Sequence, residues 1–175
     1  SSGGVFGILA KHILEKGGLV CGAAVTEDLV VKHILIDDLD SLSQLRSSKY
    51  MQSSTFECFP VIEKHLTAGD TVLYSGTPCE TAALLTYLKK PYHNLFTVDL
   101  ICHGAPSALV WKRYLNSLEK EHDSAAISAC FRDKSSGWFN YSLSVNFGNK
   151  KRYIKTFRED PYFTAFLEDW CLRHA

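Results

Sequence analysis

Several features that would assign a function directly are missing from this sequence. No two of the six cysteines form a C-x-x-C pair, which excludes a zinc ribbon or a complete ferredoxin motif within the chain. The net charge is zero, so there is neither the basic footprint of a nucleic-acid-binding protein nor an acidic tail. No apolar run approaches the roughly 18–20 residues of a membrane span. We therefore expect a soluble globular protein that binds no nucleic acid and has no membrane span.

The ends of the chain also lack familiar signals. There is no initiator Met, no charged segment followed by an apolar one as in a signal peptide, and no obvious cap after residues 170–175. These absences predict a cytoplasmic protein and a fragment of a longer chain, with metal ligands expected partly outside it. Because 175 residues can bury an adequate core, we expect free thiols rather than a disulfide framework.

The spacing of apolar residues predicts an α/β fold. Apolar residues at positions 5, 6, 9 and 13 predict a helix that Gly17-Gly18 ends, followed by an antiparallel pair of strands at 19–25 and 29–36. The elements expected next are a short acidic helix at 38–45, a polar loop at 46–53, a helix at 56–66, a strand at 71–74, a helix at 79–89, a strand at 95–101 and a helix at 108–120. This alternation is typical of βαβ units in a mixed sheet.

After Asp123 the pattern becomes rich in β structure. The expected elements are strands at 126–131, 142–147 and 152–157, the last two as a hairpin, and a final helix at 161–172. The sequence thus predicts an α/β, flavin-binding-like core at residues 1–122. Residues 123–175 are expected to form a β-rich C-terminal extension with a final helix, the start of a C-terminal domain.

The most informative local motif is the strand-to-helix turn at Thr77-Pro78-Cys79-Glu80. Thr77 suits the N-cap, Pro78 the first helical position, and Glu80 the far end of a capping box. Cys79 is therefore expected in the first turn of a helix, where the dipole and free N–H groups favour a thiolate or a cofactor phosphate. The preceding Ser75-Gly76 would let the backbone approach a ligand closely.

A second turn, Cys102-His103-Gly104, repeats this arrangement one βα unit later. If the two strands are neighbours, Cys79, Cys102 and His103 meet at the carboxyl edge of the sheet, where open α/β sheets bind ligands. A lone cysteine is more often a small core residue, but two such turns together favour a functional role. Neither turn matches a P-loop or a G-x-G-x-x-G fingerprint.

Two further segments have the composition of cofactor-binding loops. Residues 1–4 would bind phosphate through their N–H groups, although a flexible start to a helix explains them equally well. Residues 48–53 combine hydroxyls, an amide, a cation and an aromatic ring, which would grip a flavin or a phosphate but is also typical of a solvated loop. His33 lies within a predicted strand, and we interpret it as structural.

Taken together, these segments resemble the coenzyme F420 hydrogenase/dehydrogenase beta-subunit family of iron–sulfur flavoproteins. The matching blocks run in family order along nearly the whole chain: Ser1–Phe6, Gly17–Ala23, Ser48–Ser53, Gly76–Cys79, Val98–Ser107, Phe131–Lys134 with Gly137-Trp138, and Cys171–Arg173. The sequence departs from the family pattern at Ser47, where a glycine is expected. The extra side chain there would alter how closely the backbone approaches a flavin.

The resemblance implies an oxidoreductase subunit that transfers electrons or hydride between FAD, 4Fe–4S clusters and a deazaflavin-like or other conjugated acceptor. It also implies an electron-transfer partner protein or a ferredoxin-like domain, and clusters ligated mostly outside this sequence. The implied flavin contacts are Ser2, Gly3, Gly4, Ser48, Lys49, Tyr50, Gln52, Ser53, Gly76, Thr77 and Pro78. Cys79 and Cys102 are candidate cluster ligands. Lys49, which would stabilise reduced flavin, is a candidate catalytic residue together with Cys79 and His103.

Two other functions remain open on the sequence alone. Cys79 as nucleophile and His103 as base would give acyl or thiol chemistry, although no orienting Asp or Asn is identifiable. Alternatively, the chain is a scaffold or interaction domain without cofactors. A flavin absorption band in the purified protein would separate the oxidoreductase from both alternatives.

Overall fold

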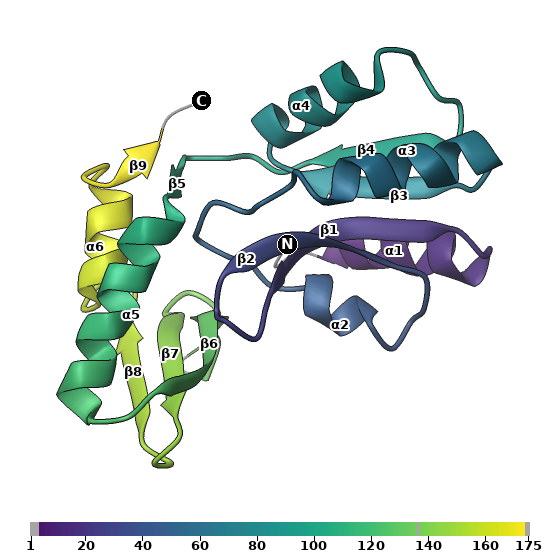
Figure 1. Cartoon of the computed structure of the whole chain (residues 1–175). Helices are drawn as coiled ribbons and strands as arrows, with labels where there is room; N and C mark the ends of the chain where they lie inside the picture. Colours follow the sequence, from purple (N-terminus) through teal and green to yellow (C-terminus); the bar gives the residue numbers. More distant parts are fainter. Residues whose placement is uncertain (1–3, 136, 174–175) are drawn as a thin grey trace. The chain divides into compact units, whose positions relative to one another are not determined.

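The computed structural model describes residues 4–135 and 137–173, and its fold is α/β (Figure 1). Tertiary packing divides the chain into two compact units. Unit 1 comprises Ser1–Ala24, Lys32–Ser47 and Ser53–Cys102, and unit 2 comprises Val25–Val31, Ser48–Gln52 and His103–Ala175. The units thus interleave along the sequence, whereas the predicted domains were continuous. A flavin-binding role for residues 1–122 stays a prediction.

Unit 1 is built on a four-stranded mixed sheet in the order β2-β1-β3-β4. Its strands are β1 (Leu19–Val25), β2 (Val31–Ile36), β3 (Val72–Gly76) and β4 (Leu95–Asp99). β3 runs parallel to both of its neighbours, with Cys21 opposite Tyr74 and Gly76 opposite Asp99. The hydrogen bond from Thr26 N to Val30 O, 2.9 Å long, closes the hairpin of β1 and β2. The predicted βαβ layer is confirmed.

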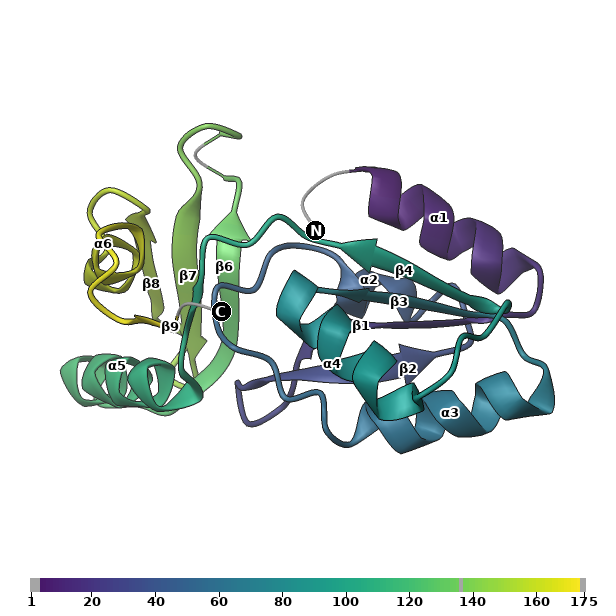
Figure 2. The same ribbon diagram turned by 90° about the horizontal axis from the view of Figure 1, so that it is seen from above.

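Four helices cover the two faces of this sheet, as a parallel layer requires. They are α1 (Gly4–Glu15), α2 (Leu42–Leu45), α3 (Cys58–Ala68) and α4 (Pro78–Leu88). Figures 1 and 2 show α1 and α2 on one side of the sheet and α3 and α4 on the other. One buried cluster joins Cys21 and Tyr74 to α3 and α4, and the other joins Val20 and Leu73 to α1 and α2. Because successive side chains of a strand point to opposite faces, both clusters follow from the same two strands.

Two details of the helices in unit 1 differ from the prediction. The buried residues of α1 are Phe6, Ala10 and Leu14, while Val5 is 69 % exposed, so the face that packs is rotated from the predicted one. Ala10 is fully buried, and its small side chain lets the helix approach the sheet closely. The acidic helix expected over 38–45 is only the four-residue α2.

Unit 2 contains an antiparallel sheet in the order β6-β7-β8 and two helices. Its elements are β5 (Ala105–Pro106), α5 (Ala108–His122), β6 (Ala126–Asp133), β7 (Ser142–Phe147), β8 (Arg152–Thr156), α6 (Pro161–Leu167) and β9 (Leu172–Arg173). Its core is aromatic: the ring of Trp111 on α5 lies 4.6 Å from that of Phe131 on β6 and 5.2 Å from that of Tyr162 on α6. The predicted hairpin of β7 and β8 is confirmed.

The end of the chain differs from the single final helix expected over 161–172. α6 ends at Leu167, and Asp169 then adopts the left-handed conformation (φ 61°) that ends a helix. Leu172 pairs with Pro106 in a short antiparallel ladder between β9 and β5. A side chain at Gly104 (φ 137°) would stand 2.8 Å from the Leu172 side chain, so this ladder requires the glycine. Within the described ranges, 4–135 and 137–173, no helix combines the length and the apolar character needed to cross a membrane.

Candidate functional site

The carboxyl edge of the sheet in unit 1 brings the two predicted turns together. β3 and β4 are adjacent and in register to their last residues, and Leu100 N donates to Gly76 O at 2.9 Å. The segments containing Cys79 and Cys102 therefore leave the sheet from the same edge, as the sequence predicted. Figure 2 shows that α1 and α4 also begin there. This edge gathers two helix N-termini and two exposed thiols within one unit.

The first turn of α4 forms the predicted capping box. Thr77 N donates to Glu80 Oε2 at 2.8 Å, and the Thr77 hydroxyl completes the box with the Glu80 backbone. Pro78 has no N–H, so the backbone donor left for an outside anion in this turn is that of Cys79. The exposed Cys79 Sγ lies 3.2 Å from Thr77 Oγ1. The motif that predicted an anion site thus uses most of its own donors internally.

Beneath this turn, Ser75 and Gly76 are buried and engaged with the protein itself. A Cβ added at Gly76 would stand 2.9 Å from Tyr74 Cε1 and 3.2 Å from Glu80 Cβ. Packing alone therefore explains this glycine. Ser75 O accepts a hydrogen bond from His33 Nε2 at 3.0 Å.

His33 is the residue whose role the sequence did not indicate. It lies on β2, yet its ring stacks on Tyr74 of β3 with centroids 5.2 Å apart. Its Nδ1 lies 2.7 Å from Ser53 Oγ, and its Nε2 lies 4.0 Å from Glu80 Oε2. The prediction that His33 is structural did not foresee that it would join two of the predicted flavin-contact segments. Its buried position in an alternating strand was the signal available.

Cys102 and His103 are adjacent in the sequence but have different surroundings. Cys102 is exposed and ends unit 1, whereas His103 belongs to unit 2. His103 Nε2 lies 2.9 Å from Asp169 Oδ1, and its ring stands edge-on to Phe166. The sequence did not identify an acid beside His103, because Asp169 lies 66 positions further along the chain, beyond any local motif.

Lys49, in the predicted loop at 46–53, belongs to unit 2, and the pKa of its amine is shifted from the usual value. Burial lowers its pKa to about 8, and the negative charge of Cys130 acts in the opposite direction. A lysine that titrates near neutral pH can take part in proton or charge transfer, which is the behaviour expected at functional sites. The geometry of unit 2 is therefore compatible with the predicted role of Lys49, which stays a prediction.

Tyr50, next to Lys49, is held at both ends. Its hydroxyl accepts a hydrogen bond from Arg132 Nη1 at 2.7 Å, and its carbonyl accepts one from the Tyr162 hydroxyl at 2.7 Å. Its ring packs against Phe163 and Phe166 with centroids 5.2 Å away. These contacts make Tyr50 part of the aromatic core of unit 2, in addition to any ligand contact.

The remaining loop residues show why the family pattern has a glycine here. Ser47 has a φ of 69°, the left-handed conformation that glycine adopts without strain. Ser48 is half-buried, and Gln52 N donates to Pro106 O at 2.9 Å. The departure at Ser47 therefore preserves the backbone path and places a serine in a strained position.

Of the predicted residues at the start of the chain, Gly4 begins α1, and Ser2 and Gly3 lie outside the described residues. A side chain at Gly4 would meet nothing within 4 Å. Among the described residues, the start of α1 therefore leaves room where a phosphate would approach a helix N-terminus.

Two buried thiols lie in the core of unit 1. Cys21 and Cys58 are hydrogen-bonded to each other, and this bond together with burial raises the pKa of Cys21 well above its usual value. Cys58 Sγ also donates to Thr55 O at 3.0 Å. Both are free cysteines, as predicted, and their burial gives them the character of core residues.

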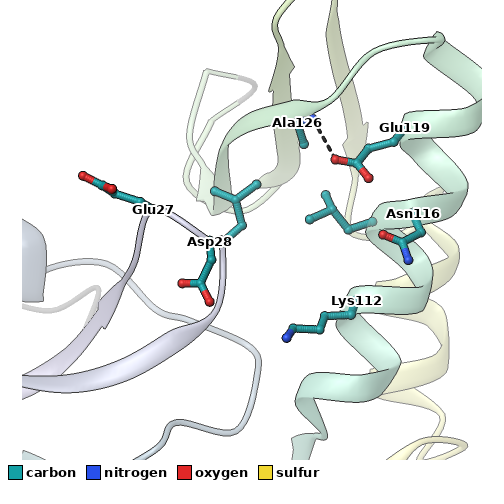
Figure 3. Close-up of a pocket in the computed structure, with 8 residues that line it drawn as sticks. Glu27, Asp28, Lys112, Asn116, Glu119 and Ala126 are labelled. Carbon is teal, nitrogen blue, oxygen red and sulfur yellow. Dashed lines mark hydrogen bonds between the residues drawn. The ribbon is translucent and has the colours of Figure 1, made fainter.

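A pocket of about 320 Å³ lies in unit 2 between the hairpin loop and α5 (Figure 3). Lys112 and Asn116 line it from α5, opposite Asp28 of the loop. Glu119 Oε1 is already engaged, because it accepts a hydrogen bond from Ala126 N at 2.9 Å. None of the predicted site residues lines this pocket, which is open and carries charges of both signs.

The groups at the carboxyl edge of unit 1 fit the chemistry of a flavin. The N-terminus of α1 suits a phosphate, and the Cys79 N–H and the Ser53 hydroxyl supply hydrogen-bonding groups. A complete 4Fe–4S cluster takes four thiolates, and no group of three or more His, Cys, Asp or Glu within 4–135 and 137–173 is placed to hold a metal. The described residues therefore do not fit a whole cluster.

Comparisons with known proteins give two findings. The family model for the C terminus of the beta subunit of coenzyme F420 hydrogenase/dehydrogenase matches residues 69–171, more than half of the chain. A chain of the F420-reducing [NiFe] hydrogenase complex from Methanosarcina barkeri has a similar fold, with a TM-score of 0.54 and 16 % identity. That match covers 90 % of this chain and 55 % of the hydrogenase chain, so the present sequence spans about half the length of its structural relative. No curated protein matches.

The family match includes both turns at the carboxyl edge, the Phe131–Lys134 block and the segment through Cys171. The structural match covers 90 % of this chain, so the likeness of fold extends beyond the residues that the family model matches. This chain belongs to the coenzyme F420 hydrogenase/dehydrogenase beta-subunit family.

Proposed function

We propose that this protein is the flavin-binding part of an oxidoreductase subunit, which exchanges electrons or hydride between FAD, 4Fe–4S clusters and a deazaflavin-like or other conjugated acceptor. The proposal rests on the carboxyl edge of β3 and β4, in a chain that belongs to this family. There the first turns of α1 and α4 begin at the edge where open α/β sheets hold nucleotide cofactors.

Each residue has a chemical role in this proposal. Gly4 and the Cys79 N–H bind cofactor phosphate at helix N-termini, and the Ser53 hydroxyl binds a polar group of the flavin. Lys49, whose pKa is lowered to about 8, holds or releases a proton beside negative charge. FAD, when bound, supplies the hydride chemistry: two electrons and one proton are exchanged together with the organic substrate, and the electrons pass singly to a one-electron partner.

The iron–sulfur part of the proposal assigns the clusters to a partner protein or a ferredoxin-like domain. Cys79 and Cys102 are exposed at the carboxyl edge and would contribute thiolates to a shared cluster or act as redox thiols. The proposed flavin binding depends on the other residues at this edge and does not require these two thiols to bind iron.

The test is to purify the full-length protein without oxygen and to measure flavin and iron. We expect a flavin absorption band with bound FAD, and reduction of a deazaflavin or another conjugated acceptor when an electron donor is supplied. Lys49→Met should weaken FAD binding or slow turnover, while Lys120→Met, a matched change at an exposed lysine of α5, should leave both within about twofold. A protein that carries neither flavin nor iron would rule out this function.

The pairing of His103 with Asp169 favours one second candidate. An acid that orients a histidine is a usual member of a nucleophilic site, and within unit 2 Asp169 stands in this relation to His103. On this alternative the protein performs acyl or thiol chemistry. The test is inactivation by iodoacetamide. If substrate protects the protein from inactivation, and removal of flavin does not change it, the result would favour this alternative over the oxidoreductase.

A further inference from the structure

His33 stands at the junction of three segments of unit 1. Its side chain is 1 % exposed, and it meets the end of the 48–53 loop, the end of β3 and the first turn of α4. Both ring nitrogens have partners in different segments: Ser53 Oγ at 2.7 Å and Ser75 O at 3.0 Å. These partners lie 20 and 42 positions away in the sequence. A buried histidine with this set of partners fixes the spacing of the segments it joins.

The sheet explains how a residue of β2 reaches β3, although β1 lies between them. Strand alternation places Cys21 and Ala23 of β1 on the face that Tyr74 occupies. Both are small, so the rings of His33 and Tyr74 can stack across β1 with planes 16° apart. The stack holds the imidazole ring in one plane, and this plane directs its two nitrogens to Ser53 and Ser75.

For a neutral His33 ring, the identity of these partners assigns the positions of the protons. A backbone carbonyl only accepts hydrogen bonds, so the Nε2 that faces Ser75 O carries a proton. In the neutral ring Nδ1 is then an acceptor, and the Ser53 hydroxyl donates to it. With its proton turned inward, Ser53 Oγ presents lone pairs outward, and it can accept a hydrogen bond from a ligand.

We propose that His33 is a positioning residue of the flavin site, which holds the Ser53 hydroxyl as an acceptor at a fixed distance from the turn that begins at Gly76. The inference rests on the proposed function, because it makes Ser53 a contact to a donor group of the flavin. His33 touches no ligand in this arrangement; it acts through Ser53 and through Ser75 O.

The backbone of His33 allows its side chain to be tested without losing the loop. His33 N donates to Ser54 O at 2.9 Å, and Lys32 pairs with Ser54 in a parallel bridge. These bonds do not depend on the side chain, so the path of the loop end should survive a substitution at position 33. A change in flavin binding then reports the position of the Ser53 hydroxyl.

The experiment compares variants that break one contact at a time. His33→Gln keeps a donor to Ser75 O and loses the contact to Ser53, while Ser53→Ala removes the same contact from the other side. We expect each to raise the dissociation constant for FAD about tenfold, the value expected for one buried hydrogen bond, and the double variant to be no worse than either. Ser53→Thr, which restores a hydroxyl, should bind within about twofold of the unaltered protein.

His65→Gln is the matched control, because His65 also has a hydrogen bond, to Asp70 at 2.8 Å, but lies at the end of α3 that precedes β3. It should leave FAD binding within about twofold. The visible absorption spectrum of bound flavin should shift in Ser53→Ala, which a merely structural role would not produce. Affinity within about twofold in both His33→Gln and Ser53→Ala would overturn the inference.

A readout without flavin separates this inference from the proposed function. In the ¹⁵N spectrum of the protein alone, we expect the His33 ring in the Nε2–H form and a change in its Nδ1 shift in Ser53→Ala. If the unaltered protein binds no FAD although this signature is present, the proposed function fails and the hydrogen bond is only structural. If the ring is in the Nδ1–H form, the positioning inference fails, whatever the flavin content.

Discussion

The two units stabilise their predicted site residues by different means. In unit 1 a parallel layer is buried on both faces by mostly aliphatic residues, and most of the predicted site residues of this unit follow the strand ends or begin a helix. In unit 2 the core is aromatic and contains buried polar groups, and the predicted residue Tyr50 is packed within it. A substitution at the strand ends of unit 1 should therefore affect binding first, whereas one in the aromatic core of unit 2 should affect stability first.

The buried carboxylate of unit 2 is the sharpest contrast with the aliphatic core of unit 1. Asp160 is fully buried, and Oδ2 accepts hydrogen bonds from Tyr114 and Tyr153, both at 2.7 Å. Its Oδ1 caps α6 by accepting from Phe163 N at 3.0 Å. Asp160→Ala removes the acceptor of three donors and leaves the Tyr114 and Tyr153 hydroxyls only their mutual hydrogen bond, so we expect it to lower the free energy of unfolding by about 4 kcal/mol.

Urea unfolding measures this effect. Asp99→Ala, at the exposed end of β4 in unit 1, is the control and should change the free energy of unfolding by less than about 0.5 kcal/mol. Equal effects at the two positions would mean that the units do not differ in the way described.

Lys49 should make the stability of the protein depend on pH. Its folded pKa of about 8 lies below the ordinary 10.5, so the unfolded chain binds more protons between these values. The contribution of Lys49 to the free energy of unfolding therefore rises with pH across this window. After allowance for solvent screening of a half-buried group, we expect a gain of about 1 to 2 kcal/mol.

The measurement is the difference in unfolding free energy between the unaltered protein and Lys49→Met at pH 7 and pH 10. This difference removes the contribution of tyrosines and cysteines that titrate in the same range. A difference that stays constant with pH would contradict the lowered pKa. The same comparison with Lys120→Met, an exposed lysine, should show no dependence.

Removing the hydroxyl from two buried tyrosines, one in each unit, should change the free energy of unfolding in opposite directions. Within the described part of the chain, the Tyr74 hydroxyl of unit 1 has no hydrogen-bond partner, whereas that of Tyr162 in unit 2 donates to Tyr50 O at 2.7 Å. Tyr74→Phe should raise the free energy of unfolding by about 1 kcal/mol, and Tyr162→Phe should lower it by about as much. Thermal melts of the two variants side by side decide whether the signs differ.

The smallest expected effect on stability concerns Ser47, the last residue of the Lys32–Ser47 segment of unit 1. Ser47→Gly removes the strain of a left-handed serine but adds freedom to the unfolded chain, so we expect a net gain of roughly 0.5 kcal/mol. The reverse change at another left-handed position, Gly17→Ser (φ 76°), should cost about 1 kcal/mol. Chemical denaturation resolves these values, and a loss of stability in Ser47→Gly would show that the serine side chain has a stabilising role.

The sequence by itself determined the elements whose signals are local. The alternation of strands with helices along the chain predicted the sheet of unit 1, and the capping box at Thr77 predicted the start of α4 almost to the residue. The family resemblance, carried by short motifs, was confirmed over residues 69–171. Each of these depends on residues a few positions apart, and such spacings follow from helix and strand geometry.

Tertiary structure decided the contacts that no local pattern encodes. His33 meets Ser75 across 42 positions, and Tyr162 meets Tyr50 across 112, because packing brings distant segments together. The same holds for β9, which leaves the predicted helix to pair with β5, and for the division of the chain into interleaved units. A sequence pattern indicates which face of an element is buried, but only the packed chain determines which side chain it meets there.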